Sequence, residues 1–244
     1  MTLSRTTPVL QVILSCRPPG GGPPVLLESL TVGPLQVNCY IIADEGSRRA
    51  IVVDPGSDAA RIIARIRALD VIPERIVNTH CHFDHVLAVN ALKAEFGIPF
   101  WVHRAAPPLL ETSAAQAAQF IGRSLERSPQ ADYLFEAGEN VAVGAIELIA
   151  FHTPGHSPDG CTFLGEGICV SGDVLFAGSV GRWDLPDADF ETLMSSIQRV
   201  YLGLPDETPV YPGHGPATTM GQERRQNPFV RALMAGHDPA TLFG

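Results

Sequence analysis

The sequence lacks an excess of positive charge. It carries 17 Lys and Arg against 26 Asp and Glu, so its formal net charge is −9 at pH 7. A nucleic-acid-binding domain usually gathers Lys and Arg on one face. The adjacent basic pairs here are only Arg48-Arg49 and Arg224-Arg225, which we interpret as solvated surface. We therefore expect no nucleic-acid partner.

The sequence also lacks regular cysteine spacing and long apolar runs. Its five cysteines are odd in number, irregularly spaced and without a C-x-x-C motif, which argues against a disulfide framework and favours a reducing compartment. No run reaches the roughly 18 apolar residues of a membrane helix. The apolar stretch at 9–14 is interrupted by Gln11, and we interpret it as a loose tail rather than an export signal. The predicted location is cytoplasmic, with no membrane partner.

Length and composition predict one folded domain behind a short tail. A chain of 244 residues that is 45% hydrophobic can bury a substantial core. Residues 17–24 read R-P-P-G-G-G-P-P, a run that neither a helix nor a central strand accommodates. We predict a flexible tail and linker at 1–24 and a single domain at 25–244. The sequence gives no indication of the oligomeric state.

The rest of the chain alternates between strand-like and helix-like segments. Helices are predicted at 57–69 with Ser57 as the cap, at 85–96, at 189–201 and after a capping box of Thr219 and Gln222. The stretch 107–127 predicts surface helices that could cover a cleft. Strands are predicted at 37–43, 50–53, 75–78, 100–103, 141–143, 146–151, 161–164, 168–171 and 210–211. This mixture predicts a layered α/β fold with mixed sheets.

Polar clusters follow four of the predicted strands. The first reads T-H-C-H-F-D-H at 79–85. Side chains alternate in an extended segment, so His80, His82 and Asp84 point the same way, Cys81 faces the core, and His85 opens the next helix. Imidazole with carboxylate suits zinc, iron or manganese rather than calcium. The cluster therefore predicts a metal site.

The other three clusters supply fewer candidates. In H-T-P-G-H-S at 152–157 the Pro-Gly pair forbids a helix, so we take His156 as a ligand and His152 as a packed residue. A buried strand ends in Asp173, and glycines flank His214, which lets the backbone approach it closely. The isolated histidines at 103 and 237 are interpreted as packed or solvated.

Taken together, these motifs resemble the metallo-β-lactamase superfamily. V-D-P-G-S at 53–57 matches its first motif, and the resemblance covers about 26–231. The segments G-D-V-L-F-A-G-S-V-G-R-W-D-L-P at 172–186, Y-P-G-H-G-P-A-T-T at 211–219 and N-P-F at 227–229 look like the glyoxalase II-like branch, which comprises hydroxyacylglutathione hydrolases and their single-domain relatives.

The resemblance implies an αββα sandwich of two mixed β-sheets flanked by helices. It implies two divalent metal ions, with zinc favoured and iron or manganese as alternatives, and a bridged water that loses its proton near neutral pH. Asp84 and Asp173 are the implied catalytic residues, and Asp54 supports the ligands. The implied substrate is a small-molecule, glutathione-derived thioester. The implied ligands are His80, His82 and His156 for one metal, Asp84, His85 and His214 for the other, and Asp173 for both.

The sequence departs from that branch at two places. Val86-Leu87-Ala88 stands where many relatives have a Gly-Gly pair, and the chain ends soon after Phe229, whereas full-length glyoxalase II enzymes continue into a helical domain that helps to hold glutathione. We therefore expect weak substrate binding. Arg182, in a loop just after Asp173, is either an anchor for an anionic substrate or a surface salt bridge.

Three other functions fit parts of the pattern. A mononuclear iron persulfide dioxygenase would use only His80, His156 and Asp173, and metal content with oxygen uptake would distinguish it. A phosphodiesterase or nuclease is disfavoured by the acidic balance of the chain. A non-catalytic binding module is disfavoured by the complete ligand set.

Overall fold

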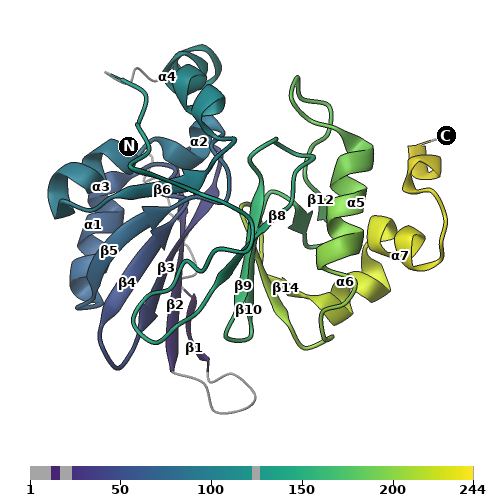
Figure 1. Cartoon of the computed structure of the whole chain (residues 1–244), viewed down its shortest axis with the longest axis horizontal. Coiled ribbons are helices and arrows are strands. Elements are labelled where there is room, and N and C mark those ends of the chain that lie inside the picture. The colour runs from purple at the N-terminus through teal and green to yellow at the C-terminus, as the bar shows by residue number, and fades with distance from the viewer. Residues whose placement is uncertain (1–11, 17–23, 123–126, 244) are drawn as a thin grey trace, which may run out of the picture.

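Two facing sheets form the centre of the molecule, and helices cover both outer faces (Figure 1). The structure is a computed structural model, and it describes residues 12–16, 24–122 and 127–243. In the described part, one sheet has seven strands, namely β1 (Val12–Cys16), β2 (Val25–Val32), β3 (Val37–Asp44), β4 (Arg49–Val53), β5 (Ile72–Val77), β6 (Phe100–His103) and β7 (Tyr133–Phe135), in that spatial order.

The second sheet has the order β14-β13-β10-β9-β8. Both sheets mix parallel and antiparallel neighbours: β4 pairs antiparallel with β3 but parallel with β5, and β10 pairs antiparallel with β9 but parallel with β13. A short hairpin, β11 (Leu175–Phe176) and β12 (Ser179–Val180), stands apart. The strands of the second sheet are β8 (Ile149–His152), β9 (Cys161–Gly165), β10 (Ile168–Gly172), β13 (Pro209–Pro212) and β14 (Thr218–Thr219).

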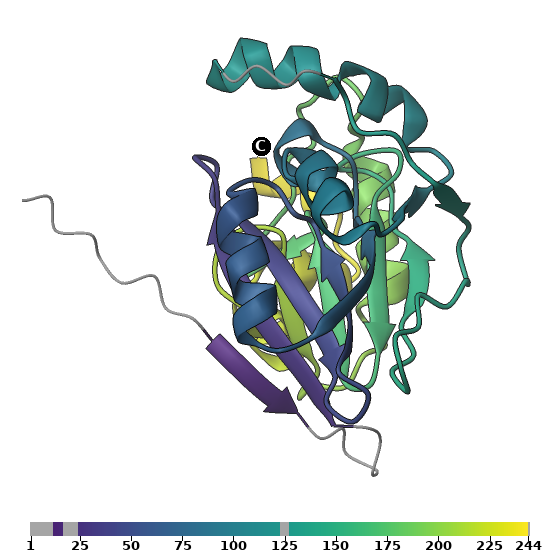
Figure 2. The same ribbon diagram turned by 90° about the vertical axis from the view of Figure 1, so that its left-hand side faces the viewer.

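Helices cover the outer face of each sheet and one end of the sandwich. α4 lies across that end (Figure 2). The helices are α1 (Ala59–Ala68), α2 (Phe83–Val86), α3 (Val89–Phe96) and α4 (Pro107–Ile121) beside the first sheet, and α5 (Phe190–Val200), α6 (Met220–Gln226), α7 (Pro228–Met234) and the 3-10 helix η1 (Pro239–Phe243) beside the second. None of the helices in the described part is long and apolar enough to cross a membrane.

Strand alternation explains the four layers. In β3, Cys39 and Ile41 join the apolar cluster under α1 and α3, whereas Tyr40 and Ile42 join the cluster between the two sheets. Neighbouring side chains of a strand point to opposite faces, so a strand that is apolar throughout must be covered on both sides. A third cluster lies between the second sheet and α5 to α7. The predicted αββα sandwich of mixed sheets is confirmed.

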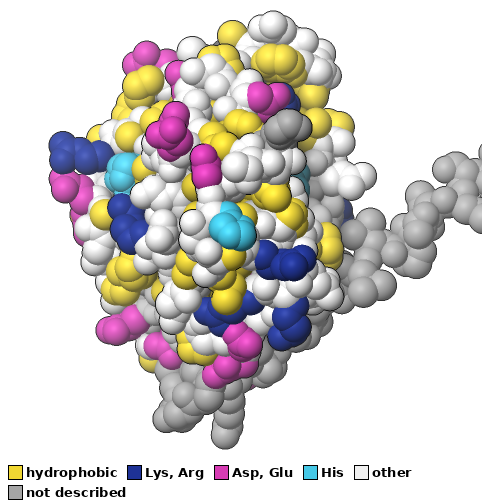
Figure 3. Space-filling view, turned by 90° about the vertical axis from the view of Figure 1, so that its right-hand side faces the viewer, with side chains coloured by type: hydrophobic (Ala, Val, Ile, Leu, Met, Phe, Trp, Pro, Cys, Tyr) yellow, Lys and Arg dark blue, Asp and Glu magenta, His cyan; other side chains and the backbone are white. Residues whose placement is uncertain are grey.

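Charge is mixed on the outer face of the second sheet. Acidic and basic side chains lie close together over the face formed by the C-terminal helices (Figure 3). The guanidinium of Arg224, for example, is paired with Asp206.

Two predicted helix starts are wrong in detail. The predicted helix at 85–96 is two helices, α2 and α3, because the Ala88 amide donates to the Pro55 carbonyl at 2.9 Å, outside the helix. Ser57 does not cap α1. The cap position belongs to Asp58, which has φ 52° and whose carboxylate accepts from the Gly33 amide. At α6, by contrast, the Thr219 hydroxyl accepts from the Gln222 amide as predicted.

Two predicted segments differ in type. The predicted strand at 141–143 forms isolated bridges rather than a strand. Residues 12–16, within the predicted tail, form β1 and pair antiparallel with β2 at the edge of the first sheet. Most of the predicted linker, at 17–23, lies outside the described residues, and the boundary near Val25 stays a prediction.

Candidate metal centre

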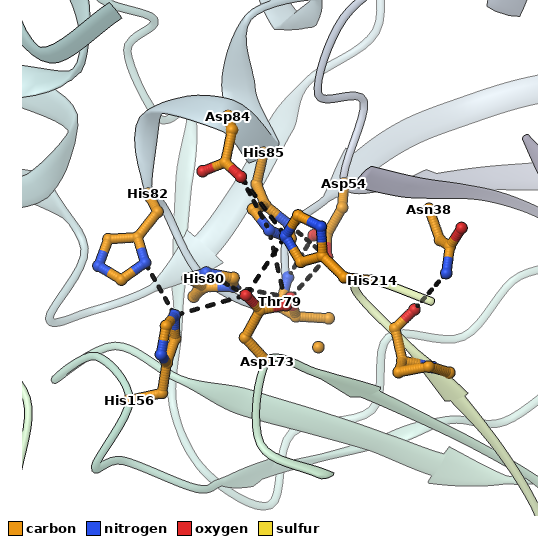
Figure 4. A network of polar contacts seen from close by, with 12 residues as sticks. Asn38, Asp54, Thr79, His80, His82, Asp84, His85, His156, Asp173 and His214 are labelled. Carbon is orange, nitrogen blue, oxygen red and sulfur yellow. Dashed lines mark hydrogen bonds and ion pairs between the residues drawn. The ribbon is translucent and has the colours of Figure 1, made fainter. Parts of the chain in front are cut away.

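All seven candidate ligands meet at one end of the sandwich (Figure 4). On the side of the first sheet, the loop after β5 contributes His80 and His82, and the short helix α2 that follows it contributes Asp84 and His85. The loops after β8, β10 and β13 contribute His156, Asp173 and His214 from the second sheet. Each loop begins where a buried strand ends, so the rigid sheets fix the positions of the side chains that follow. The centre therefore joins the two halves of the fold.

The donor atoms form two groups. Single nitrogens of His80, His82 and His156 lie within 4.8 Å of one another, and so do donor atoms of Asp84, His85 and His214. In the first group the His156 Nε2 lies 3.0 Å from the His82 Nδ1. In the second, the His214 Nε2 lies 3.4 Å from the Asp84 Oδ2.

Asp173 lies between the two groups. Its Oδ2 is 3.5 Å from the His156 Nε2 in one group and 3.5 Å from the His214 Nε2 in the other. Its Oδ1 is 3.7 Å from the His85 Nε2. This carboxylate is therefore placed to contact two cations at once.

The outward nitrogens of three histidines, His85, His156 and His214, are already hydrogen-bonded. The Nδ1 of His156 donates to the Arg182 carbonyl at 2.9 Å, and that of His214 donates to the Leu35 carbonyl at 3.0 Å. A carbonyl only accepts, so each of these Nδ1 atoms carries a proton and each Nε2 presents a lone pair to the centre. The Nδ1 of His85 faces the Asp54 Oδ2 at 3.2 Å, which gives it the same orientation.

Three inward atoms have no protein partner. The Nε2 atoms of His80 and His85 and the Oδ1 of Asp173 are buried without a hydrogen bond. Buried polar atoms are rarely left unpaired, and lone pairs that converge on one point repel unless a cation lies between them. The donor set is imidazole and carboxylate, which suits zinc, iron or manganese. The residues present therefore fit a pair of metal ions.

The electrostatics also favour cations. Burial lowers the pKa of His80 well below its usual value and that of His82 to about 4, so both imidazoles are neutral at pH 7, as metal ligands must be. Burial opposes a charge on His85 as well, but Asp84 and Asp173 outweigh it and raise its pKa to about 10. Although burial raises it, the pKa of Asp84 is lowered overall by His85 and His214. The second group therefore attracts positive charge, whether a proton or a metal ion.

A model of the metallo-β-lactamase superfamily matches residues 32–214, three quarters of the chain. The chain belongs to the metallo-β-lactamase superfamily. Among curated relatives, the hydroxyacylglutathione hydrolase GloC of Haemophilus influenzae is 37% identical over 84% of this chain and 98% of its own length. The probable metallo-hydrolase YqgX of Bacillus subtilis is 33% identical over 84% of this chain and 97% of its own length.

Solved structures agree with this superfamily assignment. The B3 metallo-β-lactamase BLEG-1 has a TM-score of 0.78 at 37% identity, covering 84% of this chain and 99% of its own. TTHA1623 in its di-iron-bound form has a TM-score of 0.75 at 39% identity, covering 82% and 98%. ETHE1 from Myxococcus xanthus has a TM-score of 0.69 at 26% identity, covering 85% and 89%.

Asp54 lies beside the candidate ligands and is hydrogen-bonded to one of them, His85, and to the neighbouring residue Thr79. Its donor atoms lie near those of His80 and His85, but both oxygens are already engaged. The Oδ1 accepts from the Thr79 amide at 2.7 Å, and the Oδ2 accepts from the Thr79 hydroxyl at 2.6 Å and from His85. Asp54 is fully buried with φ 50°, so surrounding contacts hold an unfavourable backbone conformation in place.

Three residues without a predicted role, Thr79, Asn78 and Asn38, hold the loops of the candidate ligands in place. The Thr79 hydroxyl donates to Asp54 and lies 3.2 Å from the His80 Nδ1. The Asn78 side chain donates to the His80 and His85 carbonyls, and the Asn38 side chain donates to the Pro212 and Gly215 carbonyls on either side of His214. For Asn78 the available signal was an amide side chain at the end of a predicted strand, directly before the cluster at 79–85.

Other predicted roles agree with the structure. Cys81 is fully buried in the core, as its parity requires. His152 does not face the centre: its Nε2 lies 2.8 Å from the Pro158 carbonyl, and its ring stacks on His103 at 4.2 Å. The four cysteines with described side chains are all buried free thiols.

A cleft of about 510 Å³ opens above the centre. Asp84, Asp173 and His214 line its floor, and Arg182 lies at its rim. The guanidinium of Arg182 is two-thirds exposed and makes a bidentate ion pair with Asp184 at 2.8 and 2.9 Å. The predicted surface salt bridge of Arg182 is thus present, with Asp184 as the partner. Arg182 also lines the cleft, so its position is compatible with the other predicted role, an anchor for an anionic substrate.

Proposed function

We propose that this protein is a two-metal hydrolase of small-molecule thioesters, glutathione-derived ones first. The observation that carries the proposal is the position of Asp173 between two complete donor groups. A single-metal enzyme would need only one of these groups. The GloC relative, named as a hydroxyacylglutathione hydrolase, supports the choice of substrate class.

The ligand residues suggest how the chemistry is divided. His80, His82 and His156 would hold one ion, Asp84, His85 and His214 the other, and Asp173 both; zinc is our first choice, with iron or manganese as alternatives. Bound ions would lower the pKa of a water between them and polarise the substrate carbonyl. The outward hydrogen bonds of the histidines keep their lone pairs aimed at the centre. A thiolate of pKa about 8.5 leaves without a strong general acid, which suits a site of metal ligands.

A mononuclear iron persulfide dioxygenase is the main alternative. His80, His156 and Asp173 alone would form its site, and their donor atoms do lie close together, with the His80 Nε2 4.0 Å from the Asp173 Oδ2. The di-iron-bound form of TTHA1623 shows that iron occurs on a similar chain. The second donor group around Asp84 has no role in such an enzyme, and for that reason we favour the hydrolase. We propose that the protein has neither a nucleic-acid partner nor a membrane partner.

Metal analysis combined with an activity assay tests the proposal. Purified protein should contain close to two equivalents of metal and release thiol from S-lactoylglutathione without consuming oxygen. Asp173→Ala should remove more activity than any other single ligand change, because this carboxylate contacts both groups. Asp206→Asn, a change of an exposed carboxylate in the turn between α5 and β13, is the matched control. A fully active protein with one iron that consumes oxygen would overturn the proposal.

A further inference from the structure

One wall of the cleft is apolar and comes from α4 and α2. Phe120 and Ile121 of α4 line it together with Phe83 of α2. The Phe120 side chain is 66% exposed, and its ring stacks on Phe83 with centroids 5.7 Å apart and planes 12° apart. An exposed aromatic side chain held in a cleft above a candidate active centre is an unusual feature that marks a binding surface.

The opposite wall carries charged side chains. It comes from the loop between β12 and α5, which lies opposite α4 at the same end of the sandwich (Figure 1). Arg182 and Asp187 line this wall together with Leu185 and Pro186, so it is mixed in character rather than apolar throughout. Within the described residues that line the cleft, the α4 wall contains no ionisable side chain beyond the ligands next to Phe83; its members are Leu35, Phe83, Leu109, Gln116, Phe120 and Ile121. The two walls therefore differ in the chemistry that they recognise.

The apolar wall begins at the reacting centre. Phe83 stands between the ligands His82 and Asp84 in the chain, and all three line the cleft. A thioester carbonyl at the centre projects two arms, one acyl and one thiol. A peptide-like thiol carrier bears charges and matches the Arg182 wall, which leaves the acyl arm facing Phe83 and Phe120.

We infer that the α4 wall is an acyl-binding surface, and that Phe120 makes this protein select thioesters with apolar acyl groups of several carbons over short or hydroxylated ones. The inference rests on the proposed function for its reaction. It goes beyond that function because it specifies the acyl group. The apolar wall offers no charged partner to a hydroxyacyl group, whereas each methylene of a longer acyl chain would bury additional apolar surface against it. Phe120 contributes to specificity through apolar contact and takes no part in the chemistry.

Turnover of an acyl series tests the selectivity. Acetyl, butyryl, hexanoyl and benzoyl thioesters of glutathione are compared by kcat/KM. The kcat/KM of the wild type should increase about two- to fourfold for each added methylene, and the upper value corresponds to full burial of a CH₂ group. Phe120→Ala should flatten this trend, mainly through KM, because the contact is equally strong in the ground and transition states. Phe120→Leu should keep most of it.

Binding of S-alkylglutathione thioethers supplies a readout that needs no turnover. Their affinity, measured by calorimetry on the metal-loaded protein, should rise with alkyl length in wild type and not in Phe120→Ala. Ile72→Ala is the matched control, because Ile72 is 61% exposed on β5 and does not line the cleft.

The outcomes separate the two hypotheses. A flat acyl series in an active wild type, or a trend that Phe120→Ala leaves unchanged, would overturn the acyl surface and leave the hydrolase standing. Failure to cleave any thioester, with length-dependent thioether binding intact, would overturn the hydrolase alone. Length-independent binding of the thioethers would overturn the acyl surface whatever the activity.

Discussion

At the residue scale, the ligands are oriented by neighbours that never face the cleft. Thr79 shows this best: its hydroxyl donates to Asp54, so its oxygen is left to accept from the His80 Nδ1. Asp54 in turn accepts a hydrogen bond from the Nδ1 of His85. One buried hydrogen-bond chain thus sets the tautomers of two ligands in different donor groups.

Thr79→Val should weaken metal binding without unfolding the protein. Valine keeps the shape of threonine but removes the hydroxyl, which leaves the His80 Nδ1 and one Asp54 oxygen without this partner. Loss of such a supporting contact typically costs 10- to 100-fold in metal affinity. Competition with a chromogenic chelator measures the change, and Thr79→Ser, which restores the hydroxyl, is the control. Equal affinities of the valine and serine variants would contradict this role.

The pH dependence of the metal-free protein follows from His85. Asp84 and Asp173 raise its pKa to about 10 in the fold, against 6.5 for an ordinary histidine. The folded state therefore binds more protons than the unfolded state between these values, so the stabilisation is complete below pH 6.5 and declines as pH rises toward 10. Thermal melts of chelated protein from pH 6.5 to 8.5 should show falling stability. His85→Gln should flatten the decline, and an unchanged slope in that variant would refute the assignment.

At the element scale, loop glycines allow the ligand strands to approach one another. A Cβ on Gly213 would lie 2.1 Å from the Asp173 Oδ1 and 2.9 Å from the His85 Cε1. Two ligand loops therefore pass each other at a distance that only glycine permits. The same loop is tied to β3, where the Asn38 amide donates to the Pro212 and Gly215 carbonyls.

Gly213→Ala should lower metal content and activity together. The new methyl group would displace Asp173, the residue that contacts both donor groups, so occupancy of both sites should fall. Gly203→Ala is the control, since a Cβ there meets no atom within 4 Å. Metal analysis of the two purified variants measures the difference. Full metal occupancy in Gly213→Ala would show that the loops are more adaptable than this packing indicates.

The apolar pattern of the sequence predicted those helices and strands that are determined by their own side chains. The strand at 100–103 is β6 to the residue, and α5 lies one residue inside each end of the predicted 189–201, because alternating or helical apolar patterns are local. Elements decided by distant partners were missed or misjudged. The break between α2 and α3 depends on the Pro55 carbonyl, and β1 depends on pairing with β2.

The candidate site was more predictable than the loops around it. Metal ligands are confined to few residue types, so H-x-H-x-D-H is visible without any knowledge of the fold. Asn38 and Thr79 were not visible, because their roles depend on loops that meet only after folding, 174 positions away in the case of Asn38 and Pro212. The pairing of Arg182 with Asp184 could not be predicted either, since an exposed arginine has several acceptors within reach.

At the scale of the whole molecule, the predicted domain boundary near Val25 can be tested by truncation. Among the residues with described side chains, the three apolar clusters contain residues from Val25 onward. β1 pairs with β2 at the edge of the first sheet. We predict that a variant starting at Val25 folds, binds metal and melts within a few degrees of the full chain. Insoluble or inactive protein from that variant, with the full chain intact, would place the boundary elsewhere.

The metal ions should also stabilise the fold, because their ligands come from both halves. The loop after β5 and helix α2 supply four candidate ligands beside the first sheet, and the loops of the second sheet supply three, so bound ions would cross-link the sandwich at one end. Ions that bind only the folded state, at a free concentration a thousand times their Kd, add about 4 kcal/mol to the free energy of unfolding. For a chain of this size that corresponds to roughly 10 °C in Tm.

Chelation should therefore lower Tm by roughly that amount but leave the protein folded, because the cluster between the sheets contains no ligand and persists. Differential scanning calorimetry with and without chelator measures the shift, and re-addition of zinc should reverse it. Asp173→Ala, which loses the carboxylate shared by both groups, should respond much less to either treatment. An unchanged Tm in protein shown by metal analysis to be stripped would mean that the two sheets hold together without help from the centre. In that case the geometry of the seven donors would serve chemistry alone.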